Sequence, residues 1–220
     1  KATSSKLALV KLRPTFVILT LQNLRESQDT AYIVLGRSSV MISQPVTLEQ
    51  VLQTKEERAV VQAELRSRYQ AAVVSISVNM PGQVKYDQDT LALIEYALAR
   101  LEDLFAAAGV HVSEMRRLSA VAGPAAVLAV AGDAALLKQL AVQVETEQSF
   151  GRLLDIDVFD SSGTQLSRDS SGMTGRRCFV CDEPAILCIR GRRHDAQAVR
   201  DAVVRLLEDF YQHKEANENR

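Results

Sequence analysis

The sequence of 220 residues lacks tryptophan, and aromatic residues make up only 5% of it. Proteins that recognise bases or sugars by stacking need several exposed aromatic rings, so a surface of that kind is not favoured. Three cysteines are a small and odd number, which argues against the disulfide framework of a secreted domain. A formal net charge of -1 gives no overall field that would attract nucleic acid or a membrane.

Long apolar stretches are also missing. The longest run of small uncharged residues spans 120–132 and is broken by Gly123-Pro124, which is too short for a membrane-spanning helix of about 20 residues. Residues 16–21 are apolar, but no small-residue cleavage pattern follows them, so we predict no signal peptide. We therefore expect a cytoplasmic protein with no membrane partner.

The first 40 residues differ in charge from the rest of the chain. They contain six basic and two acidic residues, a net charge of +4, and show only a weak apolar pattern. We therefore interpret residues 1–40 as an unassigned basic extension that is dispensable or not native, with Met41 as the natural start and a single domain in residues 41–220. The alternative is that these residues add a strand and a helix to the main body.

The rest of the sequence is typical of a globular protein, since 47% of the residues are apolar and 24% are charged. Thr47 with Gln50, and Thr54 with Glu57, form two capping-box patterns, which predict the starts of two N-terminal helices. In the helix predicted from Asp133, an apolar stripe is expected to face inward. The stripe consists of Leu136, Leu140 and Val144.

Residues 72–159 show the order strand, helix, strand, strand, helix, strand. These elements are predicted at 72–78, 89–105, 118–122, 126–130, 133–144 and 153–159. This βαββαβ order is that of a ferredoxin-like core, so we predict an α+β fold with an antiparallel sheet and helices on one face. A loop rich in cysteine and arginine and a helix at 195–211 follow.

Asp155 and Asp157 lie on the predicted strand 153–159, where the residues between them face the core. Two carboxylates on one strand face, about 6.6 Å apart, repel each other unless a cation or an arginine lies between them. The pair suits Mg²⁺, which binds through one or two carboxylates and the phosphates of a substrate. The alternative is two aspartates on a solvated face.

The three cysteines and one histidine near the C-terminus form a second candidate site. Their spacing, C-x2-C-x6-C-x5-H, is compatible with a zinc site made by Cys178, Cys181, Cys188 and His194. Two alternatives stay open, because buried cysteines also pack as small apolar residues and neighbouring thiols also form redox pairs.

Arginines are concentrated around these cysteines. Residues 166–194 contain six arginines against three acidic residues, a local charge of +3. The planar guanidinium group suits phosphate oxygens, and phosphoryl transfer depends mainly on positioning and charge neutralisation. Together with the aspartate pair, the arginines therefore favour a polyphosphate substrate, although a solvated basic loop is the alternative. The arginines are Arg168, Arg176, Arg177, Arg190, Arg192 and Arg193.

The C-terminal motifs together resemble one family, the apo-citrate lyase phosphoribosyl-dephospho-CoA transferases, also called holo-citrate lyase synthases. The resemblance covers about residues 44–212 and departs from the family pattern at Gly175, where proline is frequent. It is carried by Gly151-Arg152-Leu153-x-Asp155-x-Asp157-Val158, Leu166-Ser167-Arg168, Arg176-Arg177-Cys178-x-x-Cys181, Cys188, Arg190-Gly191 and His194. Upstream, Glu57-Arg58-x-x-x-Gln62 and Pro81-Gly82-x-x-Lys85 also match.

The resemblance implies a nucleotidyltransferase-type enzyme. Its donor would be 2'-(5''-triphosphoribosyl)-3'-dephospho-CoA, and a serine on the acyl-carrier (gamma) subunit of citrate lyase would attack the phosphate nearest the ribose, releasing pyrophosphate. In that reaction we expect Asp155 and Asp157 to hold Mg²⁺, and an aspartate or His194 to act as the base. The expected phosphate contacts are Arg58, Lys85, Arg152, Arg168, Arg176 and Arg177.

Two other functions remain compatible with the sequence. The first is a ferredoxin-like nucleic-acid-binding module with a zinc knuckle, which would explain the arginine loop but lacks aromatic residues for stacking. The second is a non-catalytic scaffold of the citrate lyase assembly. We favour the transferase, with no nucleic-acid partner.

Overall fold

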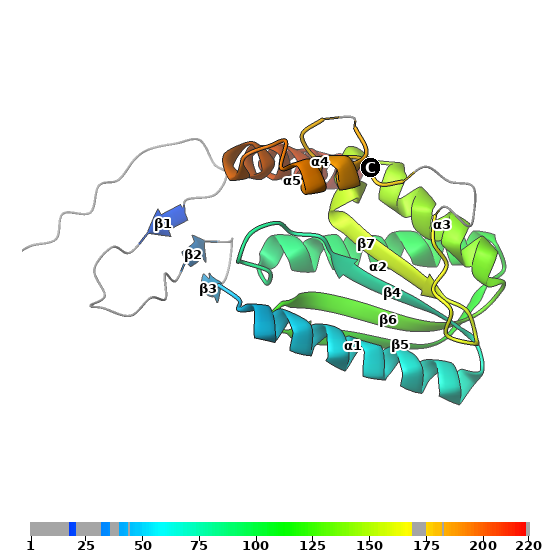
Figure 1. Ribbon diagram of the computed structural model, residues 1–220. Helices are drawn as coiled ribbons and strands as arrows, with labels where there is room; N and C mark the ends of the chain where they lie inside the picture. Colours follow the sequence, from blue (N-terminus) through cyan, green and yellow to red (C-terminus); the bar gives the residue numbers. More distant parts are fainter. Residues whose placement is uncertain are drawn as a thin grey trace, which may run out of the picture.

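The structure is a computed structural model of the chain (Figure 1). It describes residues 18–20, 32–35, 40–43, 45–168, 175–181 and 183–218. Near the N-terminus, β1 (Ile18–Thr20), β2 (Tyr32–Leu35) and β3 (Val40–Ser43) pair as a small antiparallel sheet. The boundary predicted between residues 40 and 41 therefore falls inside β3.

The main sheet has four strands in the order β5-β6-β4-β7, and each neighbouring pair is antiparallel. The strands are β4 (Ala72–Val78), β5 (His111–Ala120), β6 (Gly123–Ala131) and β7 (Leu154–Phe159). The predicted α+β class and antiparallel sheet are confirmed. The strand predicted at 118–122 begins at His111 instead and ends at Ala120. Charged residues fit into this edge strand because they have partners on both faces of the sheet: Arg116 pairs with Glu64, and Arg117 pairs with Glu95.

Helices cover both faces of this sheet (Figure 1). On one face, α2 (Gln88–Ala107), α3 (Ala134–Thr146) and α5 (Ala196–Glu218) bury a core that includes Val74 and Ile76 of β4. Val73, which points the opposite way, packs with Leu65 of α1 (Leu48–Tyr69). The predicted helices at 89–105 and 133–144 therefore share one face, and α1 packs on the other.

α1 begins at the predicted capping box. The backbone N–H of Gln50 donates to Thr47 Oγ1 at 3.2 Å, and the backbone N–H of Thr47 donates to Gln50 Oε1 at 2.9 Å. The second helix start, predicted at Thr54, is wrong, because α1 continues without a break to Tyr69. No glycine or proline interrupts this stretch, so a capping sequence in its interior does not end the helix.

Two short elements near the C-terminus were not predicted. A 3-10 helix, η1 (Ser149–Leu153), joins α3 to β7, and α4 (Ala185–Gly191) precedes α5. The helix predicted at 195–211 is α5, which continues to Glu218. Within the described parts of the chain, no helix is long and apolar enough to cross a membrane.

The outer edge of β7 is closed by side chains of α3. Glu145 accepts a hydrogen bond from the backbone N–H of Ile156 at 3.0 Å, and Lys138 Nζ donates to the Ile156 carbonyl at 3.2 Å. Further along, the Leu166 N–H donates to the Val158 carbonyl at 2.8 Å. Unpaired edge groups are a template for aggregation, and these bonds satisfy them inside one chain.

Gly151 fixes the distance between η1 and α3. A Cβ atom at this position would lie 2.7 Å from the carbonyl oxygen of Val144 and 2.8 Å from that of Glu145. We predict that Gly151→Ala lowers the free energy of unfolding by about 1–3 kcal/mol, because the backbone has to move to relieve the overlap. Urea denaturation followed by circular dichroism measures the change.

The matched control is Gly175→Ala, since a Cβ there has nothing within 4 Å. It should unfold at nearly the same urea concentration as the parent protein. Equal midpoints for the two variants would show that the contact of η1 with α3 is not tight.

Candidate functional site

A cavity of about 780 Å³ opens between the end of α3, η1, the start of β7 and the segment around α4. This volume lies within the range of about 300–1,000 Å³ typical of small-molecule sites. The apolar residues of the lining include Leu154, Phe179, Ile189 and Val199. The basic part of the lining consists of Arg152, Arg168, Arg176, Arg177, Arg192 and His194. Four arginines predicted to bind phosphate therefore meet in one cavity.

Arg152 is the most unusual member of this lining. Its Nε and Nη2 atoms are buried and have no hydrogen-bond partner; among the described residues, no other buried side-chain nitrogen or oxygen lacks one. Leaving a charged donor buried without a partner costs several kcal/mol unless an anion binds it. The cavity is therefore preorganised for a negatively charged group next to η1.

Glu145 organises two other arginines of the cavity. Its carboxylate, 1% exposed, accepts a hydrogen bond from Arg176 Nη2 at 2.7 Å and another from Arg168 Nη2. Together with the N–H of Ile156, these donors surround both carboxylate oxygens. One negative charge thus holds two positive ones, which leaves a local surplus of positive charge for a ligand.

The sequence analysis did not predict Glu145 as a site residue. The reason is that the stripe predicted to face the core in α3 begins one residue before the stripe that is buried in the structure. Leu136 and Leu140 are only partly buried, whereas Leu137, Lys138 and Ala141 are buried beside Val144 and Glu145. The spacing of Leu137, Ala141 and Glu145, four residues each, would have placed the carboxylate on the core face. A charged residue on such a face is a signal for a buried ion pair.

Asp155 and Asp157 lie on the predicted face of β7, opposite the buried Leu154 and Ile156. Asp155 accepts a hydrogen bond from Arg176 Nη2 at 2.6 Å, and Asp157 accepts one from Gln165 at 2.8 Å. Burial, and then repulsion from Asp155, raises the pKa of Asp157. Neither aspartate lines the arginine cavity, but Arg176 connects them to it because it contacts both Asp155 and Glu145.

The two upstream phosphate candidates lie outside the lining of the cavity. Lys85 Nζ donates to the carbonyl oxygen of Met80, which lies between the lining residues Asn79 and Pro81. Arg58 is on α1, on the other face of the sheet.

Arg58 precedes Gln62 by one helical turn, and Gln62 donates to Ser75 at 2.8 Å. Four helical residues and two strand residues both span about 6–7 Å, so Arg58 is level with Ser77, the β4 partner of Asp155. The helix therefore places Arg58 nearer to the aspartate pair than to the cavity.

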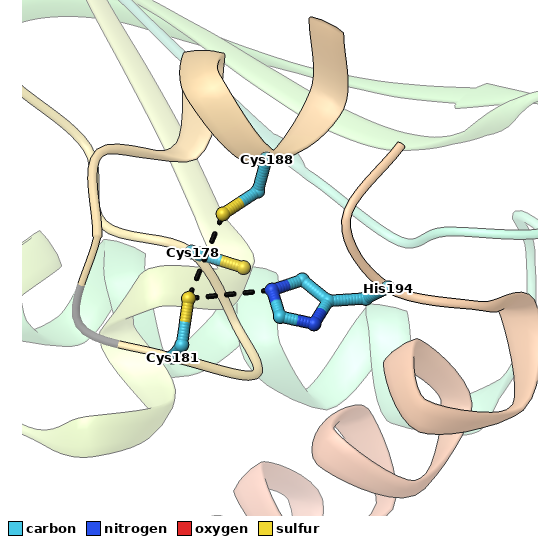
Figure 2. A group of neighbouring side chains, drawn as sticks. All are labelled: Cys178, Cys181, Cys188 and His194. Atoms are coloured by element: carbon cyan, nitrogen blue, oxygen red, sulfur yellow. Dashed lines mark hydrogen bonds between the residues drawn. The ribbon is translucent and has the colours of Figure 1, made fainter. Parts of the chain in front are cut away.

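The predicted cysteines and histidine come together as a compact group (Figure 2). Cys181 Sγ lies 3.5 Å from Cys188 Sγ and 3.3 Å from His194 Nε2, and all four donor atoms lie within 4.8 Å of one another. Ligands of a tetrahedral zinc ion are about 3.5–3.8 Å apart, given bonds of 2.0–2.3 Å. The group, termed here the Cys3His group, can therefore bind a metal ion.

The environment of these thiols points in the same direction. Burial, and then the neighbouring thiols of Cys181 and Cys178, raises the pKa of Cys188 to about 12. Crowded thiols of this kind cannot all ionise unless a cation lies among them. The donor set of three sulfurs and one imidazole therefore fits a metal such as zinc.

These features define a class of protein: an α+β domain whose arginine-lined cavity suits a polyanionic small molecule. A model of the family of apo-citrate lyase phosphoribosyl-dephospho-CoA transferases matches residues 46–210. A Vibrio cholerae serotype O1 (strain M66-2) protein, named "Probable apo-citrate lyase phosphoribosyl-dephospho-CoA transferase", is 32% identical over 166 residues, 75% of this chain and 93% of that protein. An Escherichia coli O7:K1 (strain IAI39 / ExPEC) protein named "Apo-citrate lyase phosphoribosyl-dephospho-CoA transferase" is 30% identical over 164 residues, 74% of this chain and 90% of that protein.

A Shigella boydii serotype 18 (strain CDC 3083-94 / BS512) protein with the same name as the Escherichia coli relative has the same identity and coverage. The chain therefore belongs to the apo-citrate lyase phosphoribosyl-dephospho-CoA transferase family, and it is an enzyme of the transferase class. The resemblance seen in its motifs is confirmed.

The buried carboxylate of Glu145 gives a prediction about stability. We expect Glu145→Gln to lower the free energy of unfolding by roughly 3 kcal/mol, because Arg168 loses its counter-charge in a buried site and Arg176 keeps only Asp155. Urea unfolding at neutral pH measures the loss.

Glu64→Gln is the control, since Glu64 also contacts two arginines, Arg68 and Arg116, but its side chain is 43% exposed. Solvent screening makes such a surface pair weak, so its urea midpoint should stay close to that of the parent. Similar midpoints for both glutamine variants would contradict the proposed role of Glu145.

Proposed function

We propose that the protein transfers the 2'-(5''-phosphoribosyl)-3'-dephospho-CoA group from its triphosphoribosyl precursor to a serine of the apo acyl-carrier (gamma) subunit of citrate lyase. The observation that carries the proposal is Arg152, whose Nε and Nη2 atoms are buried without a hydrogen-bond partner in an arginine-lined cavity. A donor with three linked phosphates supplies the anion that this group lacks. The family name of the relatives supports the nature of the transferred group.

In this proposal the arginines bind the triphosphate. A guanidinium has five N–H donors, so Arg168 and Arg176 can contact Glu145 and a phosphate at the same time. Arg152 and Arg177 contact the same triphosphate from η1 and from the start of the α4 segment. The apolar lining residues Phe179 and Ile189 contact a less polar part of the donor.

The reaction is a displacement at phosphorus. The serine oxygen of the carrier forms a bond to the phosphorus nearest the ribose, the bond from this phosphorus to the bridging oxygen breaks, and pyrophosphate leaves with the bonding electrons. Arginines around the transferred phosphate stabilise the charge that develops on its oxygens. The product is a phosphodiester between the serine and the prosthetic group.

The proton of the serine needs an acceptor. Of the candidates predicted from the sequence, His194 contacts Cys181 through Nε2 and is assigned to the Cys3His group. The aspartate pair remains, and the raised pKa of Asp157 suits a proton acceptor. We assign Arg58 to the same side, where its charge would stabilise the ionised pair.

Metals enter the proposal at two places. Asp155 and Asp157 fit Mg²⁺, because they offer carboxylate oxygens and their mutual repulsion is relieved by a cation. When bound there, Mg²⁺ would supply positive charge that stabilises the leaving pyrophosphate. Zinc is proposed for the Cys3His group, where protein ligands fill all four positions and leave none for the substrate.

The wider setting is also a proposal. The strand order β5-β6-β4-β7, with α2 and α3 on one face, supports a ferredoxin-like topology for residues 72–159. We assign catalysis to a single domain in residues 41–220, with Lys85 as a further phosphate contact close to Asn79 and Pro81. Reduced thiols in the Cys3His group fit a cytoplasmic location.

Arg152→Gln tests the central observation. We predict a loss of about 100-fold in kcat/KM for transfer, since the variant lacks the charged donor that meets the triphosphate. Stability should stay equal or rise, because the buried unpartnered charge is removed. Intact-mass measurement of the carrier over time gives the rate, and urea unfolding gives the stability.

Arg205→Gln is the matched control, since Arg205 is an exposed residue of α5 outside the cavity lining. It should transfer at the parent rate. An Arg152 variant that also transfers at the parent rate would remove the argument for an anion site at η1.

The aspartate pair gives a separate prediction about metal. Titration with Mn²⁺, followed by electron paramagnetic resonance as a stand-in for Mg²⁺, should show a site that Asp155→Asn and Asp157→Asn each weaken at least about 10-fold. Asp160→Asn is the control, because Asp160 lies just after β7 and bonds to Ser162 and Thr164 instead. Unchanged Mn²⁺ affinity in both pair variants would remove the metal from this position.

A further inference from the structure

We propose that zinc in the Cys3His group builds one wall of the substrate cavity, and that the wall does not form without the metal. This wall, termed the arginine wall, consists of the described residues 175–181 and 183–194. The inference deepens the proposed function, because the same wall supplies arginines to the donor site. Its metal is structural and stays away from the reacting atoms.

The arginine wall buries little apolar surface. Among its described residues, only Cys178 and Cys188 are buried, at 8% and 6% exposure, and both belong to the Cys3His group. Two apolar side chains of α4, Ile186 and Ile189, are 50% and 71% exposed. A segment with so little buried apolar surface cannot offset the entropy of ordering its backbone. Another source of stability is therefore needed.

The second support is the shortness of α4. It has seven residues, and Pro184 at its N-cap gives no side-chain hydrogen bond. Helices of this length are unstable on their own, since few bonds form for each nucleus. Cys188 lies in the middle of α4, so a metal bond at this residue would fix the helix to the rest of the group.

The third support is how the four ligands are connected. The Cys178 N–H donates to the Glu183 carbonyl at 2.9 Å, and the Ala185 N–H donates to the Arg176 carbonyl at 2.8 Å. These bonds place Cys178 on a hairpin, two residues after Arg176. Figure 2 shows Cys188 reaching the group from the helix above it, Cys181 from below and His194 from the right.

His194 ties the wall to the main core. It directly precedes Asp195, whose carboxylate accepts the Ala198 N–H at 2.7 Å at the start of α5. α5 in turn buries Val203, Leu206 and Phe210 in the core. One tetrahedral ion would therefore join the hairpin, α4 and the start of α5, in addition to the contact of Phe179 with the main core.

The placement of the cavity residues gives the consequence. Arg176, Arg177 and Arg192 of the arginine wall line the cavity together with Cys178, Cys188 and His194. Three of the five cavity arginines are thus held within four residues of a metal ligand. Loss of the metal should displace Arg177 and Arg192, whereas Arg152 stays with η1, and Arg168 and Arg176 stay with Glu145.

The test uses the full-length chain, grown in zinc-sufficient medium and purified without chelators. Metal analysis should give one zinc per chain, and Cys181→Ser should reduce it below about 0.1. Hydrogen exchange should then speed up at least about 10-fold for amides of α4, with no change in β4. The unchanged β4 shows that the variant is folded.

His194→Cys supplies a conservative variant, because four thiolates also bind zinc. The His194→Cys variant should retain zinc, and the amides of α4 should exchange as slowly as in the parent protein. The His194→Ala variant should lose zinc, and its α4 amides should exchange faster. Two results overturn the proposal: full-length protein that contains no zinc, or zinc-depleted protein whose α4 exchanges as slowly as before. The alternatives of inert thiols and a redox pair predict these results.

Metal analysis and hydrogen exchange do not depend on turnover. The zinc proposal and the proposed transferase function can therefore be contradicted independently. A protein that carries zinc and an ordered arginine wall but modifies no carrier contradicts the proposed function alone. A zinc-free protein that modifies its carrier contradicts the metal proposal alone.

Discussion

The hydrogen bonds of Glu145 join the fold to the site. This buried carboxylate closes the edge of β7 at Ile156 and at the same time holds Arg168 and Arg176. A buried charge is stable only when it is fully paired, so the strand edge and the arginines depend on each other. Any change in α3 therefore alters the sheet edge and the cavity together.

Arg176 extends this dependence across the strand. By contacting Glu145 and Asp155 it connects the arginine cavity to the aspartate pair, which lies on the other face of β7. Two groups of opposite charge thus stand on either side of one edge strand. In the proposed reaction the arginines would neutralise phosphate and the aspartates would hold the metal.

The alternation of β7 and the spacing of the cysteines and His194 could be predicted from the sequence, because local periodicity and ligand spacing decide them. Glu145 could not, since an error of one residue in the phase of α3 turned it away from the core. The burial of Arg152 Nε and Nη2 without a partner depends on how η1, α3 and the segment around α4 surround the cavity. Local sequence patterns do not predict such an arrangement. By contrast, the continuity of α1 past Thr54 could have been predicted, because no glycine or proline interrupts residues 48–69.

Transfer of a phosphoribosyl-dephospho-CoA group to a carrier serine is the reaction that we propose for this chain. The most direct test incubates full-length protein with the apo-carrier subunit, Mg²⁺ and the triphosphoribosyl donor, and follows carrier mass and pyrophosphate together. The account predicts that the carrier gains the mass of one prosthetic group for each pyrophosphate released, and that a carrier with alanine in place of the serine gains none. A folded, metal-replete protein that leaves the carrier mass unchanged would contradict it.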